Sequence, residues 1–140
     1  MIYWFPLALT IKFMDYIFLA ARLLFGGYFV VSGWSHLRHP DMLAGYAASK
    51  KVTSPKFMVV LSGLMVFLGG LGIIVGLEVG ISVLLIVLFL IPVTFIMHNY
   101  WADTDPQAKM NNRVQFMKNM ALIGGALAFL AVAMPWPISF

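Results

Sequence analysis

Residues 57–101 read FMVVLSGLMVFLGGLGIIVGLEVGISVLLIVLFLIPVTFIMHNYW, and this stretch decides the fold. Its single charged residue, Glu78, stands near the middle. About 20 consecutive apolar residues are needed for a helix to cross a bilayer. The stretch therefore predicts two membrane-spanning helices, over 57–77 and 79–101, joined by a very tight connection. Pro92 lies inside the second helix and should kink it.

The rest of the chain continues this pattern and predicts two further spans, over 16–35 and 114–134. The chain has 140 residues, of which 62% are hydrophobic and 10% charged, and its mean hydropathy is +0.95. A soluble domain carries about 25% charged residues, so too few are present here to cover a surface that faces water. We expect an all-α fold, an integral membrane four-helix bundle formed as a single transmembrane domain by residues 1–140.

The segments beside the spans predict shorter elements. The first residues, MIYWFPLALTIKF, have neither the basic start nor the cleavage site of a signal peptide, so we interpret them as an interfacial segment leading into the first helix. Pro40 is suited to open a short helix after the first span, and Ser54 with Pro55 to open the second span. The short helix would lie flat in the interface on one apolar face, which comprises Met42, Leu43, Tyr46 and Ala47.

Aromatic and basic residues support this division. The tryptophans fall at span edges, where indole rings prefer to lie: Trp4, Trp34, Trp101 and Trp136. The loops after the first and third spans hold most of the basic residues: Arg38, Lys50, Lys51, Lys56, Lys109, Arg113 and Lys118. The positive-inside rule then predicts both long loops in the cytoplasm and both termini outside.

Charge and cysteine content exclude several classes of function. The net charge of +4 comes from basic residues clustered in loops, which favours anionic lipid headgroups over nucleic acid as the partner. The chain has no cysteine, so disulfides, thiolate nucleophiles, iron–sulfur ligation and Cys-based zinc sites are excluded. No phosphate-binding loop, hydrolase elbow or dinucleotide fingerprint is present either.

Small residues recur in the spans, as glycine pairs at 26–27, 69–70 and 124–125 and as the G-x-x-x-G of Gly72 and Gly76. Glycine lets helix backbones approach closely in lipid. The pattern is typical of packing within one bundle, and a dedicated dimer face is the alternative.

Arg22 lies about two turns into the first span, where an unpaired charge is costly. One interpretation is a structural ion pair with Glu78 or Asp15, which lie on the same side of the membrane. The alternatives are a ligand or quinone site and snorkelling of the long side chain toward the interface.

Three polar residues should converge at one membrane depth, His98 at the end of the third span, Asn119 in the fourth and His36 at the end of the first. His98 and Asn119 could simply hold two helices together through a hydrogen bond. Alternatively they could bind a polar headgroup, such as a quinone carbonyl, or shuttle protons near neutral pH. No H-x-x-x-H pair is present, so we predict no metal site.

Five pieces of the sequence carry a family resemblance: ARLLFGGYFVVSGWSHLRHP, AGYAASKKVTSP, LSGLMVFLGGLGIIVGL, FIMHNYW and NRVQFMKNMALIGGAL. Together they resemble the DoxX family of small four-helix inner-membrane proteins, from about residue 21 to about residue 130. In that family a histidine among aromatics closes the third helix, and an aromatic–x–Lys–Asn segment opens the fourth. The matching positions are His98, Tyr100, Trp101, Phe116, Lys118, Asn119 and Gly124, with Arg22 matching an arginine of the first helix.

One position departs from the family pattern. Members often have a glutamate in the second helix shortly before the paired glycines, and Val66 stands there in this chain. An acidic partner for Arg22 is therefore missing inside the span, and Glu78 would have to replace it from the membrane edge.

The convergence of these polar groups at one membrane depth, together with the resemblance, favours an auxiliary or small-molecule-binding membrane subunit that works with a redox partner, and a quinone is the possible ligand. The residues that would bind this ligand are His98, Asn119, Trp101, Arg22 and His36. The alternative is a non-catalytic structural or accessory subunit that docks onto a larger membrane complex. Expected partners are membrane lipid and other membrane subunits or a second copy of the chain. Whether the chain is itself an enzyme stays open.

Overall fold

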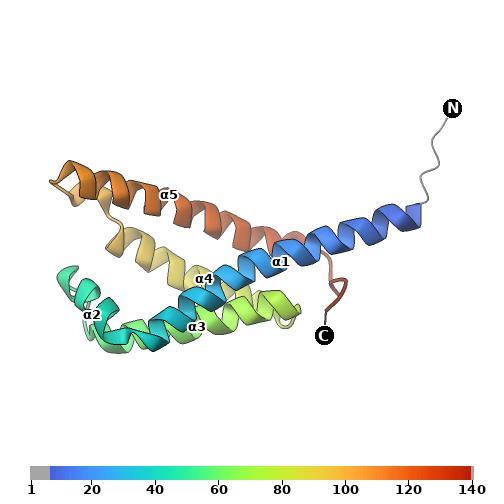
Figure 1. Cartoon of the computed structure of the whole chain (residues 1–140), viewed down its shortest axis with the longest axis horizontal. Coiled ribbons are helices and arrows are strands. Elements are labelled where there is room, and N and C mark those ends of the chain that lie inside the picture. Colours follow the sequence, from blue (N-terminus) through green and yellow to red (C-terminus); the bar gives the residue numbers. More distant parts are fainter. Residues whose placement is uncertain (1–6, 140) are drawn as a thin grey trace.

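The chain forms a bundle of long helices in a computed structural model that describes the backbone of residues 7–139 and the side chains of residues 12–139. The helices are α1 (Leu7–Arg38), α2 (Pro40–Ser49), α3 (Pro55–Val75), α4 (Val79–Pro92) and α5 (Pro106–Ala128) (Figure 1). Three short turns follow α4 and α5: a π-helical turn at Val93–Met97 and 3₁₀ turns at Tyr100–Ala102 and Phe129–Ala131.

The predicted all-α class and the four spans are confirmed. Segments long and apolar enough to cross a membrane are Lys12–Arg38, Pro55–Val75, Val79–Ala102 and Pro106–Ala131. The segment predicted to lie in the interface is helical from Leu7 onward and continues directly into the first span. No glycine or proline follows until well inside the span, so nothing interrupts the helix there. Trp4 lies outside the described residues.

The α3–α4 connection is as tight as predicted, and Gly76 makes it. Gly76 has φ +76°, in the left-handed region that suits a residue without a side chain. Its amide and that of Leu77 both donate to Gly72 O, at 2.9 and 3.1 Å. The G-x-x-x-G pattern of Gly72 and Gly76 is therefore a helix end, and Gly80 has no atom near the place of a Cβ.

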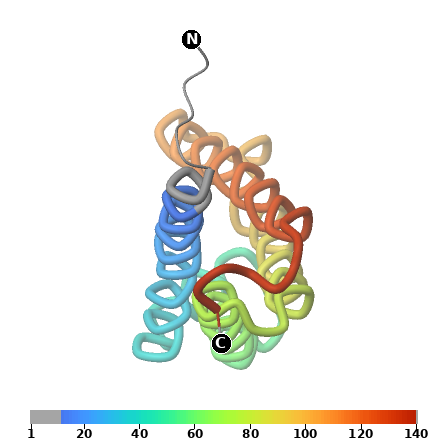
Figure 2. Tube along the Cα trace, turned by 90° about the vertical axis from the view of Figure 1, so that its right-hand side faces the viewer, coloured from blue at the N-terminus to red at the C-terminus, as the bar shows by residue number. Residues whose placement is uncertain are grey.

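The helices pack in the order α1, α3, α4, α5, with α2 resting on α3. Viewed along the bundle, α1 and α5 occupy opposite sides (Figure 2). The largest group of buried residues joins all four long helices and includes Phe29, Val66, Ile86 and Phe129. Since Val66 is fully buried among apolar neighbours, the position of the family's glutamate is part of the core.

α2 begins at Pro40, as predicted, ends at Ser49 and rests on α3 through small residues. Ala44 and Ala47 are buried against Val59 of α3, whereas Met42 is 69% exposed. Small residues let this short helix sit close to α3. Ala47, predicted to face the membrane interface, thus packs against α3 instead.

The kink predicted at Pro92 takes the form of a change in helix type. Proline has no amide hydrogen to donate, and the chain leaves α-helical geometry directly after Pro92, in the π-helical turn Val93–Met97. Thr94, fully buried, donates its hydroxyl hydrogen to Leu90 O at 2.5 Å. This turn sets the direction in which His98 leaves the third span.

Candidate functional site

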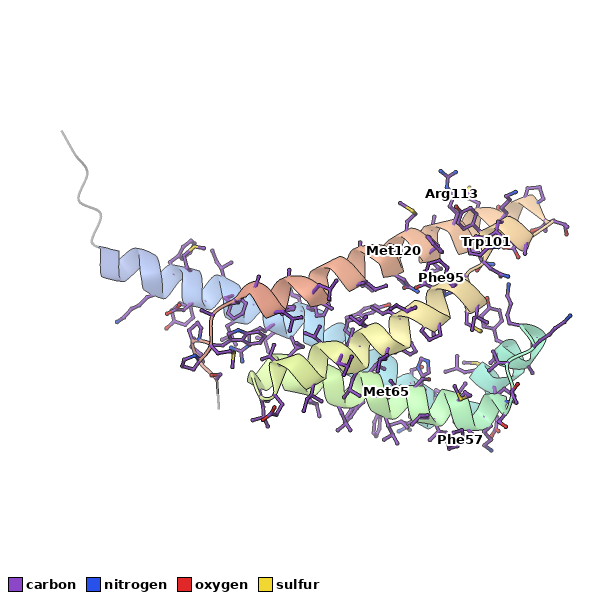
Figure 3. All side chains as sticks on the ribbon, turned by 180° about the vertical axis from the view of Figure 1, so that it is seen from behind. Phe57, Met65, Phe95, Trp101, Arg113 and Met120 are labelled. Atoms are coloured by element: carbon purple, nitrogen blue, oxygen red, sulfur yellow. The ribbon has the colours of Figure 1, made fainter. Side chains whose placement is uncertain are left out.

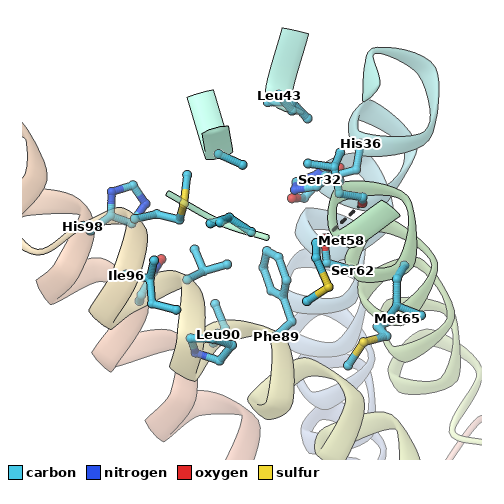
Figure 4. Close-up of a pocket in the computed structure, with 18 of the residues that line it drawn as sticks. Ser32, His36, Leu43, Met58, Ser62, Met65, Phe89, Leu90, Ile96 and His98 are labelled. Atoms are coloured by element: carbon cyan, nitrogen blue, oxygen red, sulfur yellow. Dashed lines mark hydrogen bonds between the residues drawn. The ribbon is translucent and has the colours of Figure 1, made fainter. Parts of the chain in front are cut away.

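A cavity of about 340 Å³ lies between the halves of the long helices that are nearer to the α1–α3 and α4–α5 connections (Figure 4). We call this end of the bundle the loop side. α2 covers the cavity there. Most of its lining is aliphatic, aromatic or methionine side chain. Its polar lining residues are Tyr28, Ser32, His36, Tyr46, Ser62, His98, Lys118 and Asn119. An apolar pocket with a few converging polar groups is the usual form of a small-molecule site.

The cavity reaches the lipid-facing surface between α3 and α4. Leu61 of α3 and Leu88 and Ile96 of the third span line it, and these side chains are 40%, 51% and 45% exposed. All three lie within membrane-spanning segments, so the exposed surface faces acyl chains. A molecule dissolved in the bilayer can therefore enter the cavity sideways.

His36 is held by its own helix. Its Nδ1 donates to Ser32 O at 2.8 Å, one turn earlier in α1, and its ring lies edge-on to Phe89 at 5.7 Å. A Cβ on Gly63 would lie 2.6 Å from the Cβ of His36, so only glycine lets α3 pass at this point.

His98 is held by a chain of hydrogen bonds that the sequence did not predict. Its Nδ1 lies 3.1 Å from Oδ1 of Asn112, and Nδ2 of Asn112 donates to Asp103 at 2.8 Å. The predicted hydrogen bond between His98 and Asn119 is therefore wrong. Asn112 and Asn119 lie two turns apart on one face of α5, and this seven-residue spacing is the signal that could have identified Asn112.

Asn119 lines the cavity with no hydrogen bond to its amide among the described residues. Its side chain is only 4% exposed, and burying an amide without a partner costs about 1–3 kcal/mol. No fully enclosed side-chain atom of the described part lacks a partner, so the amide of Asn119 borders open space. That space is the cavity.

Lys118 closes the side of the cavity between α1 and α5. Its ammonium lies 5.7 Å from the centre of the Tyr28 ring and donates to Gln115. The long alkyl stem covers apolar surface while the charge stays at the edge.

Three polar contacts tie α2 to the end of the third span. The Tyr46 hydroxyl donates to Met97 O at 3.1 Å, and Lys50 donates to Asn99 at 2.9 Å and lies 3.8 Å from Asp103. Burial and then the charge of Asp103 raise the pKa of Tyr46. Its hydroxyl therefore stays protonated and keeps its bond to Met97.

Arg22 lies at the opposite end of the bundle and does not line the cavity. The predicted ion pair with Glu78 or Asp15 is wrong, since the guanidinium, fully buried, binds only carbonyl oxygens among the described residues. These belong to Ile73 (3.1 Å), Ile74, Pro137 (2.9 Å) and Ile138 (3.2 Å). The Phe18 and Trp136 rings lie on it at 5.8 and 5.3 Å.

Arg22 thus binds the last carbonyls of α3, where the partial negative charge of a helix end favours a cation. It also holds the C-terminal segment, which crosses from the end of α5 to the end of α3 (Figure 2). Trp136 belongs to this segment and is buried.

Trp101 also lies outside the cavity lining. It is 53% exposed and packs with Phe95, Tyr100 and Phe116 at ring distances of 6.5, 5.3 and 5.8 Å. Figure 3 shows it beside Phe95, near the start of α5. Of the five predicted ligand-binding residues, the cavity thus brings together His36, His98 and Asn119.

The fold and this cavity define the class of protein: a four-helix integral membrane protein with an apolar chamber open to lipid. The chain belongs to the DoxX family, whose model matches residues 17–99. It is 30% identical over 130 residues to the inner membrane protein YqjF of Escherichia coli (strain K12), covering 90% of this chain and 88% of that protein. No solved structure matches. The chain is a multi-pass protein of the inner membrane.

Proposed function

We propose that this protein binds a lipophilic small molecule whose polar head reaches His36, His98 and Asn119, and that it serves as an auxiliary subunit to a redox partner. A quinone is the candidate ligand. The observation that supports the proposal best is the buried amide of Asn119, which has no hydrogen-bond partner among the described residues and lines the cavity.

The shape and chemistry of the cavity fit such a molecule. The polar groups stand at the loop side, and the apolar wall continues to the lipid between α3 and α4. An amphiphile could place its head among the two imidazoles and the amide while its tail stays in the bilayer. The quinone head would be oriented by hydrogen bonds, and the apolar wall would exclude water.

The test measures the affinity of a decyl-tailed quinone, in its reduced quinol form, for the protein in lipid nanodiscs. Losing a buried hydrogen bond costs about 1 kcal/mol or more, so His98→Ala and Asn119→Ala should each weaken binding by roughly 5-fold or more. His39→Ala and Asn111→Ala are the matched controls, because both side chains are exposed and outside the cavity. Equal affinity in all four variants would refute a site at these residues.

An accessory subunit without a ligand is the second candidate, and two glycines favour it. Gly27 of α1 and Gly124 of α5 have no atom within 4 Å of the place of a Cβ, although small residues usually mark helix contacts in lipid. Under this alternative, Gly27→Leu or Gly124→Leu would release a co-purifying membrane partner after gentle extraction. Release of a partner with ligand affinity unchanged would favour docking over ligand binding.

A further inference from the structure

We infer that the two imidazoles present hydrogen-bond acceptors to the cavity, which therefore takes a ligand that donates: a lipophilic phenol or alcohol, or the reduced, quinol form of the proposed quinone, bound through its hydroxyl hydrogens. This inference rests on the proposed function, because it specifies which chemistry the same cavity recognises. It follows from the hydrogen bonds that the lining residues already donate within the protein.

The direction of the His98 bond is fixed from its far end. A carboxylate can only accept, so the Asn112 amide must turn its NH₂ toward Asp103, as the 2.8 Å contact shows. The carbonyl oxygen of Asn112 then faces His98 at 3.1 Å, and Nδ1 of His98 must carry the hydrogen. In the neutral ring, Nε2 is left with a lone pair.

The direction of the His36 bond is fixed in the same way. Its Nδ1 partner is the backbone carbonyl of Ser32, at 2.8 Å, and a carbonyl has no hydrogen to give. Nδ1 of His36 therefore donates, and Nε2 again keeps a lone pair. The two rings stand on opposite sides of the cavity (Figure 4).

Two hydroxyl groups that line the cavity also donate their hydrogens to backbone carbonyls already. Tyr46 donates to Met97 O at 3.1 Å, and Ser62 donates to Val59 O at 3.0 Å. What each oxygen can still offer is a lone pair. Together with the two imidazoles, four residues that line the cavity can thus accept a further hydrogen bond but have no side-chain hydrogen left to donate.

The other polar groups of the lining can still donate. The Tyr28 and Ser32 hydroxyls and the Asn119 amide can donate or accept, and the Lys118 ammonium keeps two hydrogens after its bond to Gln115. The two imidazoles, in contrast, offer only lone pairs. A hydroxyl group can pair with either imidazole, whereas a carbonyl or ether oxygen can pair with neither.

The test compares two probes with the same ring and tail, 4-octylphenol and its methyl ether 4-octylanisole, bound to the full chain in nanodiscs. The phenol should bind about tenfold more tightly, as one good hydrogen bond predicts. Tyr46→Phe removes an acceptor oxygen and should lower the phenol affinity a few-fold while leaving the ether affinity unchanged.

A second variant tests the chain behind His98. Asp103→Asn gives Asn112 a neighbour that can also donate, so the Asn112 amide can turn and His98 can present a hydrogen instead of a lone pair. The preference for the phenol over the ether should then fall to about threefold or less. Asp41→Asn is the matched control, because Asp41 is exposed and pairs with Lys56 away from the cavity.

The outcomes separate the two proposals. Equal affinity for phenol and ether in the unmodified protein would overturn the inference but leave the cavity as a site for lipophilic molecules. A phenol preference that Asp103→Asn does not alter would overturn the assigned direction of the His98 bond. Failure of both probes and of the quinone to bind would overturn the proposed function together with the inference.

Discussion

Arg22 shows how a charged residue can be buried in a membrane protein without a carboxylate. Four backbone carbonyls and two aromatic faces surround its guanidinium. Most of these acceptors become available because α3 ends there and the C-terminal segment folds back. A sequence pattern shows that an intramembrane charge needs partners, but it does not show that backbone groups distant along the chain will supply them.

Replacing Arg22 should loosen the end of the bundle and leave the cavity intact. Arg22→Leu leaves four carbonyls without their donor, so we expect a loss of stability of roughly 3 kcal/mol or more. Thermal unfolding followed by tryptophan fluorescence would measure this loss, and limited proteolysis should cut the C-terminal segment sooner. Arg38→Leu is the control, since Arg38 is exposed. An Arg22→Leu protein as stable as this control would contradict the assigned role.

His36, His98 and Asn119 line one cavity, but His98 bonds to Asn112 rather than to Asn119. Membrane depth follows from where hydropathy begins and ends, so the sequence could place all three near one level. Which way each side chain points depends on helix rotation and on the π-helical turn after Pro92. Neither the helix rotation nor this turn can be predicted from the sequence. His98 therefore bonds to Asn112 and not, as expected, to Asn119.

At the scale of elements, the glycine pairs divide into contact and open positions. A Cβ on Gly26 would lie 2.6 Å from Gly70 O, and a Cβ on Gly33 would lie 2.6 Å from Gly63 O. Gly27, the neighbour of Gly26, has nothing within 4 Å. The sequence predicted close packing in the bundle correctly. At 26–27 and 124–125 only one glycine makes a contact, and which one depends on helix rotation, whereas both do at 69–70.

Adding one methyl group at the α1–α3 crossing should disturb both stability and the site. Gly63→Ala places a Cβ against the Cβ of His36, so the helices must separate and the ring must shift. We expect about 1–3 kcal/mol of destabilisation and weaker ligand binding. Gly27→Ala, on the same pair of helices, should change neither quantity. Thermal unfolding and quinone affinity measure the two effects, and identical behaviour of both variants would contradict this packing.

α2 should act as a cover that controls how fast a ligand leaves toward the loop side. Lys50→Met breaks its contacts with Asn99 and Asp103, so the dissociation rate should rise several-fold with less change in affinity. Stopped-flow displacement of the bound probe measures this rate, and Lys51→Met is the control because Lys51 is exposed. An unchanged dissociation rate in Lys50→Met would show that the ligand leaves only through the lipid side.

The Tyr46 contact should be independent of pH over the physiological range. Its pKa is raised by burial and by Asp103, so the neutral hydroxyl is favoured in the folded state. Its contribution is fully present below the ordinary tyrosine value of about 10 and is lost only as the pH rises through the raised value. The difference in dissociation rate between Tyr46→Phe and the unmodified protein should therefore be the same at about pH 6 and about pH 9. A difference that disappears by about pH 9 would contradict the direction of the shift.

At the scale of the whole molecule, the absence of cysteine offers a direct test of orientation. The basic loops predict that the α1–α3 and α4–α5 connections face the cytoplasm. A single cysteine placed at Thr53 should be protected from an impermeant thiol reagent in intact cells, and one placed at Glu78 should be labelled. The reverse labelling pattern would show that the α1–α3 and α4–α5 connections, and with them the loop side of the cavity, face away from the cytoplasm.

The fold forms a bundle that is closed at one end and contains the cavity at the other. Arg22 and Trp136 tie together the closed end, while α2 covers the hollow end around His36, His98 and Asn119. Composition alone predicted the four spans, because lipid leaves a chain of this hydropathy no other way to satisfy its backbone. The cavity could not be predicted, since it depends on how far α3 and α4 diverge beyond their close contact at Gly69 and Ile86.

The most direct test of a ligand-binding cavity is native mass spectrometry of the protein extracted from its own membrane in lipid discs. We expect a single small lipophilic molecule to be retained by the unmodified chain and by Asn111→Leu, and to be lost from Asn119→Leu. Retention of the same molecule by Asn119→Leu, or an unmodified chain that carries nothing but bulk phospholipid, would contradict it.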